Sequence, residues 1–561
     1  MRGWVKAALF VIGGLWPWLA HASSATAAPI DWGQKIAEAA LTDRSGDPLS
    51  GRNRVWSYQQ ALYLLGLKQV YDRTGDERLL DHLEQWGRQH VEPDGRIVAS
   101  PGGEPIVLDT LDSLMPGRVV LVLWQITGDT RYRLAAETIR QRLADWPGTC
   151  NGAFWHKDSP KPWSANVIWA DGSFMFAPFL VEYSRLFPAD ANTGRDEAAR
   201  QLEAYGSLLQ DPDSGLLWHA FDQDRYHPWA KQPNPQHAPV IWCRAVGWYG
   251  VALVTVLDGL PVNHPYRVPL LNRLTKLMDG YRRYLVPSEG RWRQVMNAPA
   301  TIETEDGPLT NFTETSCSAL HAYVVARAVE EGWLTLAQHR AAALAAQGVV
   351  YRLSLDEGRP VLDGAVKGTG IGADQAAYLN PASIVRNDLH GLGAFLLMYE
   401  SALRRPPPDA IQLQIEAEAG TVRRPMAVLA EADASNGRLV AIPRSPDGPA
   451  IDPAGRMLVT VDLPRAGRYR IWGRFLAPST DANTLRLRID GKAWWTWDIQ
   501  PHPTLLRWDS LRIDTGYATP PMLNLAAGRH TIELGYGEGG LRIDALLLTT
   551  AKVYAPVGEE Q

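Results

Sequence analysis

Apolar residues recur at three- and four-residue spacing over residues 31–405, which predicts a long helical region. One segment is repeated, because Val70–Arg78 is echoed by Leu123–Arg131, with Gly75 and Gly128 placed 53 residues apart. Each copy predicts a helix ending at a C-cap glycine and a second helix opened by an Asp. A unit of this length holds two helices and two loops, so the region holds about six or seven helical hairpins. Such hairpins can close into a ring, an α/α barrel, or stack as an open solenoid, and the pattern alone does not separate the two.

The pattern changes at residues 404–410, where three consecutive prolines predict a linker, because proline cannot continue a helix. Beyond it, short alternating segments separated by turn residues predict strands. These segments are Met457–Leu463, Tyr469–Phe475, Leu485–Asp490 and His530–Leu534. We therefore expect a helical domain over residues 31–403 and a smaller all-β sandwich over residues 411–553.

Residues 1–27 have the pattern of a signal peptide. Arg2 and Lys6 precede the apolar run Ala7–Ala20, and small residues suited to cleavage follow. This predicts a secreted or periplasmic protein, with a retained amphiphilic anchor as the lesser alternative. No later segment approaches the roughly 20 apolar residues that a membrane span needs.

Composition limits the class of protein. A chain of 561 residues that is 45% hydrophobic and 21% charged is long enough for two domains. Its formal net charge of -5 provides no overall basic field to attract nucleic acid. The three cysteines, Cys150, Cys243 and Cys317, allow one disulfide and match no zinc pattern. Trp (22) outnumbers Tyr (19) and Phe (10), which favours stacking on sugar rings, although large cores also use Trp as filler.

One carboxylate interrupts the apolar segment Ile168–Met175, where Asp171 lies between Ala170 and Gly172. An ionised carboxylate is costly to remove from water unless it is paired, hydrogen-bonded or protonated. Asp171 is therefore expected to have a perturbed pKa or a dedicated partner, and either property favours a catalytic role.

Other segments place single polar residues beside aromatic ones at predicted helix starts, as a sugar-binding recess requires. They are Trp56–Tyr58, Leu111–Arg118, Phe154–Lys157, Gly215–Asp222, Ile241–Tyr249 and Asn311–Ser316. In this order, and with the closing Asp388–Phe395, they resemble the unsaturated glucuronyl and rhamnogalacturonyl hydrolases of glycoside hydrolase family 105. The resemblance runs from about Trp32 to Glu400. It implies an α/α six-hairpin barrel that removes a 4,5-unsaturated uronic acid from oligosaccharides left by polysaccharide lyases.

The resemblance also implies site residues. It places the catalytic carboxylates at Asp171 and Asp112, and contacts to the oligosaccharide substrate at His156, His219, Arg244, Trp248, Trp56 and Tyr58. Asp171, held protonated by apolar surroundings, would give its proton to C4 of the unsaturated ring, and no cofactor is needed for catalysis. Ala170 and Cys243 depart from the family pattern, and the approach over residues 157–167 is longer than usual.

Each of these roles has a structural alternative. Asp171 and Asp112 could cap helices, and the two histidines could be core residues. Arg244 could pair with Asp222 or Glu314, and the aromatic residues could belong to the core. For the whole protein, the alternatives are a hydrolase of intact uronides and a catalytically silent glycan-binding protein.

The β domain resembles carbohydrate-binding modules of families 6 and 35 through Ile415–Glu418, Phe475–Ser479 and Leu541–Asp544. The resemblance implies a structural calcium held by Glu416, Glu418 and Asp544. Candidates for a polysaccharide-binding platform are Trp494, Trp495, Trp497 and Trp508. The alternative is that this domain only packs against the barrel and buries those rings.

Overall fold

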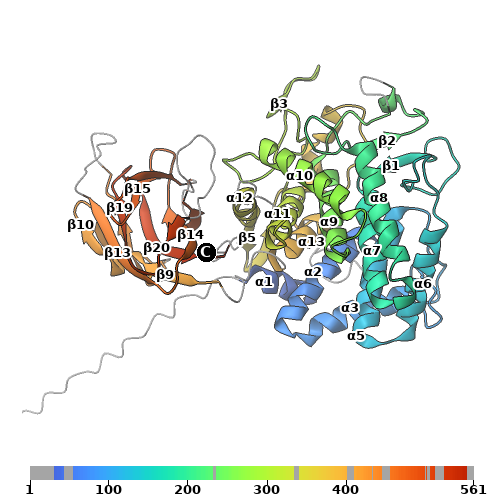
Figure 1. Ribbon diagram of the computed structural model, residues 1–561, viewed down its shortest axis with the longest axis horizontal. Coiled ribbons are helices and arrows are strands. Elements are labelled where there is room, and N and C mark those ends of the chain that lie inside the picture. The colour runs from blue at the N-terminus through green and yellow to red at the C-terminus, as the bar shows by residue number, and fades with distance from the viewer. Residues whose placement is uncertain are drawn as a thin grey trace, which may run out of the picture.

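The computed structural model contains a helical domain followed by a β domain (Figure 1). It describes residues 31–42, 55–231, 236–333, 340–400, 410–432, 434–444, 455–499, 501, 506–511 and 523–551. The expected signal peptide lies outside the described residues, as does all but the last residue of the expected linker. None of the described helices is long and apolar enough to cross a membrane.

Two concentric layers of helices form the first domain. The inner layer contains α2 (Tyr58–Thr74), α5 (Gly117–Thr127), α7 (Gly172–Leu186), α9 (Cys243–Gly259), α11 (Thr315–Glu330) and α13 (Leu389–Met398). The outer layer contains α1 (Trp32–Leu41), α3 (Glu77–His90), α6 (Thr130–Ala144), α8 (Thr193–Leu209), α10 (Arg267–Tyr284) and α12 (Arg340–Val350), and the short α4 (Leu111–Leu114) precedes α5. Each inner helix packs on the next, and α13 packs on α2, so the ring closes. The domain is a six-hairpin barrel and not an open solenoid.

The repeated segment has the capping role that its sequence predicts. Gly75 and Gly128 end α2 and α5 in the left-handed conformation, with φ of 69° and 68°. Asp76 and Asp129 then open α3 and α6, and each side chain accepts a hydrogen bond from the backbone two residues on. These caps turn the chain between inner and outer helices within a few residues.

Short strands shape the loops at the ends of the barrel. They pair as β1 (Val167–Trp169) with β2 (Ala220–Asp222), β3 (Thr301–Ile302) with β4 (Leu309–Thr310), β5 (Leu353–Asp356) with β6 (Arg359–Leu362) and β7 (Ala365–Val366) with β8 (Ile384–Val385). Single 3₁₀ turns occur at Pro188–Asp190, Pro228–Ala230, Ala376–Tyr378 and Pro381–Ser383. The β1–β2 pair matters most for the site, because it fixes the segment before α7 against the loop that carries His219.

The β domain is a sandwich of two antiparallel sheets. One has the order β10 (Thr421–Arg423), β13 (Arg456–Leu463), β19 (Gly528–Gly535), β15 (Thr484–Ile489) and β16 (Trp495–Asp498). The other contains β11 (Ala427–Ala430), β12 (Arg438–Ala441), β20 (Arg542–Thr549), β14 (Gly467–Leu476) and β17 (Arg507–Ser510), with β9 (Gln412–Glu416) on β20 and β18 (Leu523–Leu525) on β14. A 3₁₀ turn at Ala417–Ala419 follows β9. A buried apolar cluster fills the space between the sheets, and the four strands expected from the sequence are all present.

The second sheet packs against the barrel. Trp472 of β14 and Leu547 of β20 are buried in the same apolar cluster as the barrel core, and Trp508 packs against that cluster. The Tyr351 hydroxyl, just after α12, donates a hydrogen bond to the Trp508 carbonyl at 3.2 Å. The two domains therefore share a buried interface.

Two of the four tryptophans expected to bind sugar are unsuited to it. Trp497 is fully buried inside the sandwich, where its indole N–H donates to Asp509, so it cannot reach a glycan. Trp508 packs against the barrel core instead of facing outward. Trp495 rests partly buried on the sandwich core, and the guanidinium groups of three arginines lie 4.4–5.3 Å from the ring centroid of Trp494. Polysaccharide binding by this domain stays a prediction.

The carboxylates expected to hold calcium do not form one donor set. Ser435 hydrogen-bonds to both Glu416 and Asp544, and the Arg474 guanidinium donates to Asp544 at 2.6 Å. Glu418 instead accepts from an asparagine side chain. The described residues contain no group of three or more His, Cys, Asp or Glu side chains that could hold a metal. Because an arginine already neutralises Asp544, these residues do not fit the all-oxygen shell that calcium requires.

Candidate active site

The site lies where the inner helices of the barrel begin. Tyr58, Arg244 and His390 stand in the first turns of α2, α9 and α13, and Asp171 directly precedes α7. Helix N-termini carry partial positive charge from their unpaired N–H groups. A site beside several of them therefore favours an anionic ligand.

Asp171 is enclosed but is not used as a helix cap. It is 8% exposed and occupies the N-cap position of α7, yet its side chain makes no capping hydrogen bond. Among the described residues, its Oδ2 atom has no hydrogen-bond partner that meets distance and angle criteria. The helix-cap alternative is thus excluded.

His219 is the neighbour of that carboxylate. The backbone N–H of Ala170 donates to the His219 carbonyl at 2.9 Å, which continues the β1–β2 pairing and brings His219 Nε2 to 3.4 Å from Asp171 Oδ2. The other ring nitrogen, Nδ1, lies 2.7 Å from the Tyr378 hydroxyl. Tyr378 thus fixes the ring so that Nε2 points at Asp171.

Asp112 and His156 form a second acid–histidine pair. Asp112 lies inside α4, which Thr110 caps, so Asp112 is not the cap either. His156 Nε2 is 4.0 Å from Asp112 Oδ1, and the His156 ring stacks on Trp169 at 4.3 Å and 3°. Since Trp169 belongs to β1, the two acid–histidine pairs are joined by one short strand.

The two carboxyl groups have pKa values shifted in opposite directions. Burial raises the pKa of Asp171, but the contact with His219 and the charges of His219 and His156 outweigh it, so this pKa is lowered below that of an ordinary aspartate. Removal from bulk water raises the pKa of Asp112, His156 pulls it down, and the charge of Asp171 adds to the increase. The expectation that the surroundings of Asp171 raise its pKa is therefore wrong for the free site. Two neighbouring carboxyls with separated pKa values suit acid–base catalysis.

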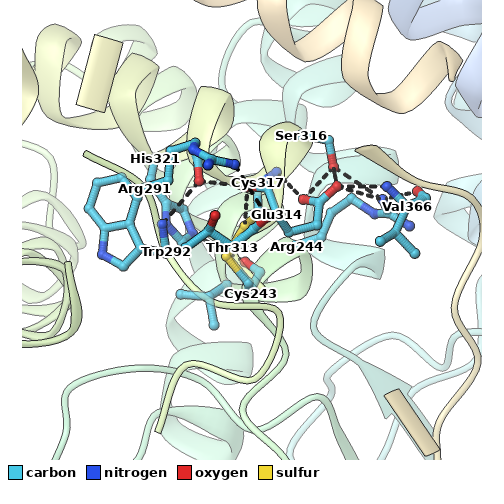
Figure 2. The surroundings of a disulfide bond; sticks show 12 residues. Cys243, Arg244, Arg291, Trp292, Thr313, Glu314, Ser316, Cys317, His321 and Val366 are labelled. Carbon is cyan, nitrogen blue, oxygen red and sulfur yellow. Dashed lines mark hydrogen bonds and ion pairs between the residues drawn. A yellow bond between two sulfur atoms is a disulfide. The ribbon is translucent and has the colours of Figure 1, made fainter. Parts of the chain in front are cut away.

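Arg244 is bound by the protein itself. Its guanidinium donates to the Val366 and Lys367 carbonyls and to the Ser316 hydroxyl, and it lies 3.8 Å from Glu314 (Figure 2). The residue is 1% exposed. Arg244 is therefore bound within the protein, as the alternative to substrate contact expected, and its acidic partner is Glu314 and not Asp222. It acts on the site through its charge.

A disulfide adjoins this cluster. Cys243 and Cys317, in the first turns of α9 and α11, are bonded to each other and fully buried, whereas Cys150 is free and exposed. Glu314 caps α11 by accepting from the Cys317 N–H, and it also accepts from the Val366 N–H. The departure from the family pattern at position 243 is thus one half of a staple between two inner helices.

The predicted aromatic contacts divide between core and site. Trp248 is 1% exposed and stacks on Phe174 at 4.6 Å, so it belongs to the core. Trp56 stacks on Trp86, and its indole N–H donates to the Ser113 carbonyl at 2.8 Å, which anchors α4. Tyr58 is partly exposed, and its hydroxyl hydrogen-bonds to His390 at 2.8 Å.

Some residues of the site were not predicted from the sequence. Tyr378 acts on the site through His219, and it lies in a loop with no local signal. Asp388 and His390 were visible only as part of a family segment, although an Asp two residues before a His at a helix start is a capping pattern. The site pairs two acids with two histidines, and a pair of carboxyl groups is the usual equipment of a glycoside hydrolase.

Comparison with known proteins agrees with the fold of the helical domain. The model of Glycosyl Hydrolase Family 88 matches residues 34–405, and the chain belongs to this family. Protein Atu3128 of Agrobacterium fabrum is 32% identical over 41% of this chain and 98% of its own length. The unsaturated rhamnogalacturonyl hydrolase YesR of Bacillus subtilis is 24% identical over 44% of this chain and 65% of its own. A solved family 105 glycoside hydrolase from C. acetobutylicum covers 66% of this chain and 99% of its own, at 26% identity and a TM-score of 0.59. The family model ends before the β domain.

Proposed function

We propose that this protein removes a 4,5-unsaturated uronic acid from the non-reducing end of oligosaccharides produced by polysaccharide lyases. The observation that carries the proposal is Asp171, an enclosed carboxylate with no capping role that faces His219. Asp112 lies close enough for its pKa to respond to the charge of Asp171. Relatives of this chain are named as hydrolases of unsaturated rhamnogalacturonyl and rhamnoglycuronyl compounds. The helix N-termini at the site favour the substrate's carboxylate.

The reaction suited to this site is the hydration of a vinyl ether. A proton is added to C4, the resulting cation at C5 accepts water, and the water loses its proton to the carboxylate that gave the first one. The product is a hemiketal, which opens and releases the remaining sugar. Because no group is displaced at the anomeric carbon, the spacing of the two carboxylates does not set retention or inversion.

Asp171 is proposed as the proton donor, although its pKa is lowered in the free site. The substrate brings its own carboxylate, and a second negative charge nearby raises the pKa of Asp171 in the complex. Asp112 is the second candidate donor, because its pKa is raised where that of Asp171 is lowered.

Separate substitution of the two acids tests the assignment. Lyase-generated unsaturated disaccharides are incubated with wild-type protein, Asp171→Asn and Asp112→Asn, and loss of the ultraviolet absorbance of the conjugated uronate is followed. Loss of the donor lowers kcat by about 10²- to 10⁴-fold. If Asp171→Asn stays active and Asp112→Asn does not, the donor is Asp112. If wild-type protein leaves every lyase product unchanged but releases sugar from saturated uronides, the substrate is an intact uronide. If it binds these sugars without turnover, it is a glycan-binding protein.

Export to an oxidising compartment is part of the proposal. It is supported by the signal-peptide pattern of residues 1–27 and by the buried Cys243–Cys317 disulfide, since disulfides persist in secreted and periplasmic proteins. N-terminal sequencing of the protein from fractionated cells tests it. A cytosolic protein that keeps its first residues would contradict export.

A further inference from the structure

A three-residue chain of hydrogen bonds closes the inner ring beside the two carboxylates. Tyr58 is the first residue of α2, and His390 is the second residue of α13. The Tyr58 hydroxyl is 2.8 Å from His390 Nε2, and His390 Nδ1 is 2.6 Å from Asp388 Oδ1. Because α2 and α13 are the first and last inner helices, this chain joins the two ends of the barrel domain.

The direction of these hydrogen bonds follows from their chemistry. An ionised carboxylate only accepts, so His390 must donate to Asp388 from Nδ1. Burial and the charge of Arg244 lower the pKa of His390, which keeps the ring neutral and leaves Nε2 as an acceptor. Tyr58 must then donate its hydrogen to His390. Burial and the charge of Asp112 raise the pKa of Tyr58 far above its usual range, so that hydrogen stays in place.

As a consequence, the Tyr58 oxygen can only accept a further hydrogen bond. With its hydrogen committed to His390, the oxygen has only lone pairs to offer to another group. We infer that the Asp388–His390 pair locks Tyr58 as a hydrogen-bond acceptor, so that Tyr58 recognises a ring hydroxyl of the substrate and rejects its carboxylate. His390 and Asp388 are therefore positioning residues that orient the uronic ring relative to Asp171.

Without the lock, Tyr58 would have other acceptors for its hydrogen. Asp112 and Asp171 both act electrostatically on the Tyr58 hydroxyl. A hydroxyl that donated to either carboxylate would neutralise part of the charge used in acid–base chemistry. The neutral His390 ring removes this competition, because it accepts the hydrogen and adds no charge.

The test compares an unsaturated disaccharide with its forms deoxygenated at C2 or at C3 of the unsaturated ring. Wild-type kcat/KM is expected to fall by about 10- to 100-fold on one of the two deoxy substrates. Tyr58→Phe is expected to lose a similar factor on the parent substrate and nothing more on that deoxy substrate. His390→Phe should show the same pattern, and the double variant should be no worse than either single one.

Rescue and control variants separate positioning from folding. His390→Gln can still accept a hydrogen from Tyr58 through its amide oxygen, so it should recover most of the activity. Asp388→Ala should behave like His390→Phe. Its matched control is Asp129→Ala, which removes an N-cap of the same type from α6 in the outer layer and should leave kcat/KM unchanged. Two results would contradict the lock. In one, His390→Phe lowers kcat/KM by the same factor on the parent and on both deoxy substrates. In the other, His390→Phe has the kcat/KM of wild type on all three.

This inference rests on the proposed function, and the two fail differently. If wild-type protein is inactive on every lyase product, the proposed function fails. The lock is then judged by calorimetric titration with galacturonic acid, where Tyr58→Phe and His390→Phe must weaken binding by the same factor. Unequal effects, or unchanged binding, would overturn it.

Discussion

At the residue scale, the informative feature is one carboxylate whose neighbours set its protonation. Asp171 is enclosed in an apolar segment, which by itself would favour the neutral acid. His219, held by Tyr378, reverses that preference in the free site. The charge state of Asp171 is thus decided by a histidine that lies 48 residues away in the chain.

Removal of this histidine should change the pH dependence of the reaction. A proton donor works in its protonated form, so kcat/KM falls as pH rises through the donor's pKa. His219→Asn removes the group that lowers the pKa of Asp171 and leaves burial to raise it. We expect the fall in kcat/KM to move to higher pH in this variant, as measured by pH–rate profiles.

A histidine outside the site provides the control for that experiment. His264 pairs with Asp196 away from the site, and His264→Asn should keep the wild-type profile. If the His219→Asn profile coincides with that of wild type, Asp171 does not control the fall in kcat/KM at high pH. An Asp112→Asn variant whose remaining kcat/KM no longer falls as pH rises would assign that fall to the other acid.

At the element scale, the N-terminal ends of the inner helices bring the site residues together. The hairpins place the beginnings of several inner helices close together, so residues far apart in the chain meet there. Cys243 and Cys317 staple the starts of α9 and α11, the two helices that hold Arg244 and Glu314. Both half-cystines are fully buried, so the staple is part of the barrel wall.

Loss of the staple should lower stability. The bond links residues 74 apart, and a constraint of that span on the unfolded chain is worth about 2–5 kcal/mol. The Cys243→Ala/Cys317→Ala variant should therefore show a lower free energy of unfolding in urea, and reductant should have no further effect on it. Cys150→Ser, which removes the free exposed thiol, should match wild type. If the double variant unfolds at the wild-type midpoint, packing alone holds the two helices.

At the scale of the whole molecule, the two domains are coupled by a buried aromatic contact. Trp472 is fully buried yet belongs to the apolar cluster of the barrel and not to the core of its own sandwich. A large side chain in that position ties the unfolding of the β domain to that of the barrel. This agrees with the alternative that the β domain packs against the barrel and buries some of its tryptophans.

Truncation of this side chain should uncouple the domains. Trp472→Ala removes a buried ring, a change that costs about 3–5 kcal/mol when the site cannot collapse. We expect calorimetry to show a separate, lower-temperature transition for the β domain. Trp494→Ala, on the turn beside the other sheet, should leave the transition pattern unchanged. A Trp472→Ala protein that melts like wild type would show that the interface carries little energy.

Local patterns determined much of this protein. Helical periodicity gave the hairpins, because the buried face of a helix repeats every three to four residues. Gly75, Gly128 and the Asp residues that follow them predicted the turns, because backbone conformation and capping are local properties. The change to alternating segments gave the β domain, and the odd apolar setting of Asp171 marked the site.

Only the tertiary structure decided the rest. The sequence allowed a ring or a solenoid, and the packing of α13 on α2 made it a ring, because closure depends on contacts between the two ends of the domain. It left the cysteine pair open, and the adjacency of α9 and α11 chose Cys243 and Cys317. The pKa of Asp171, the internal use of Arg244 and the buried state of Trp497 likewise come from neighbours distant in the chain. Charge and burial depend on what surrounds a residue in space, and the sequence states only what precedes and follows it.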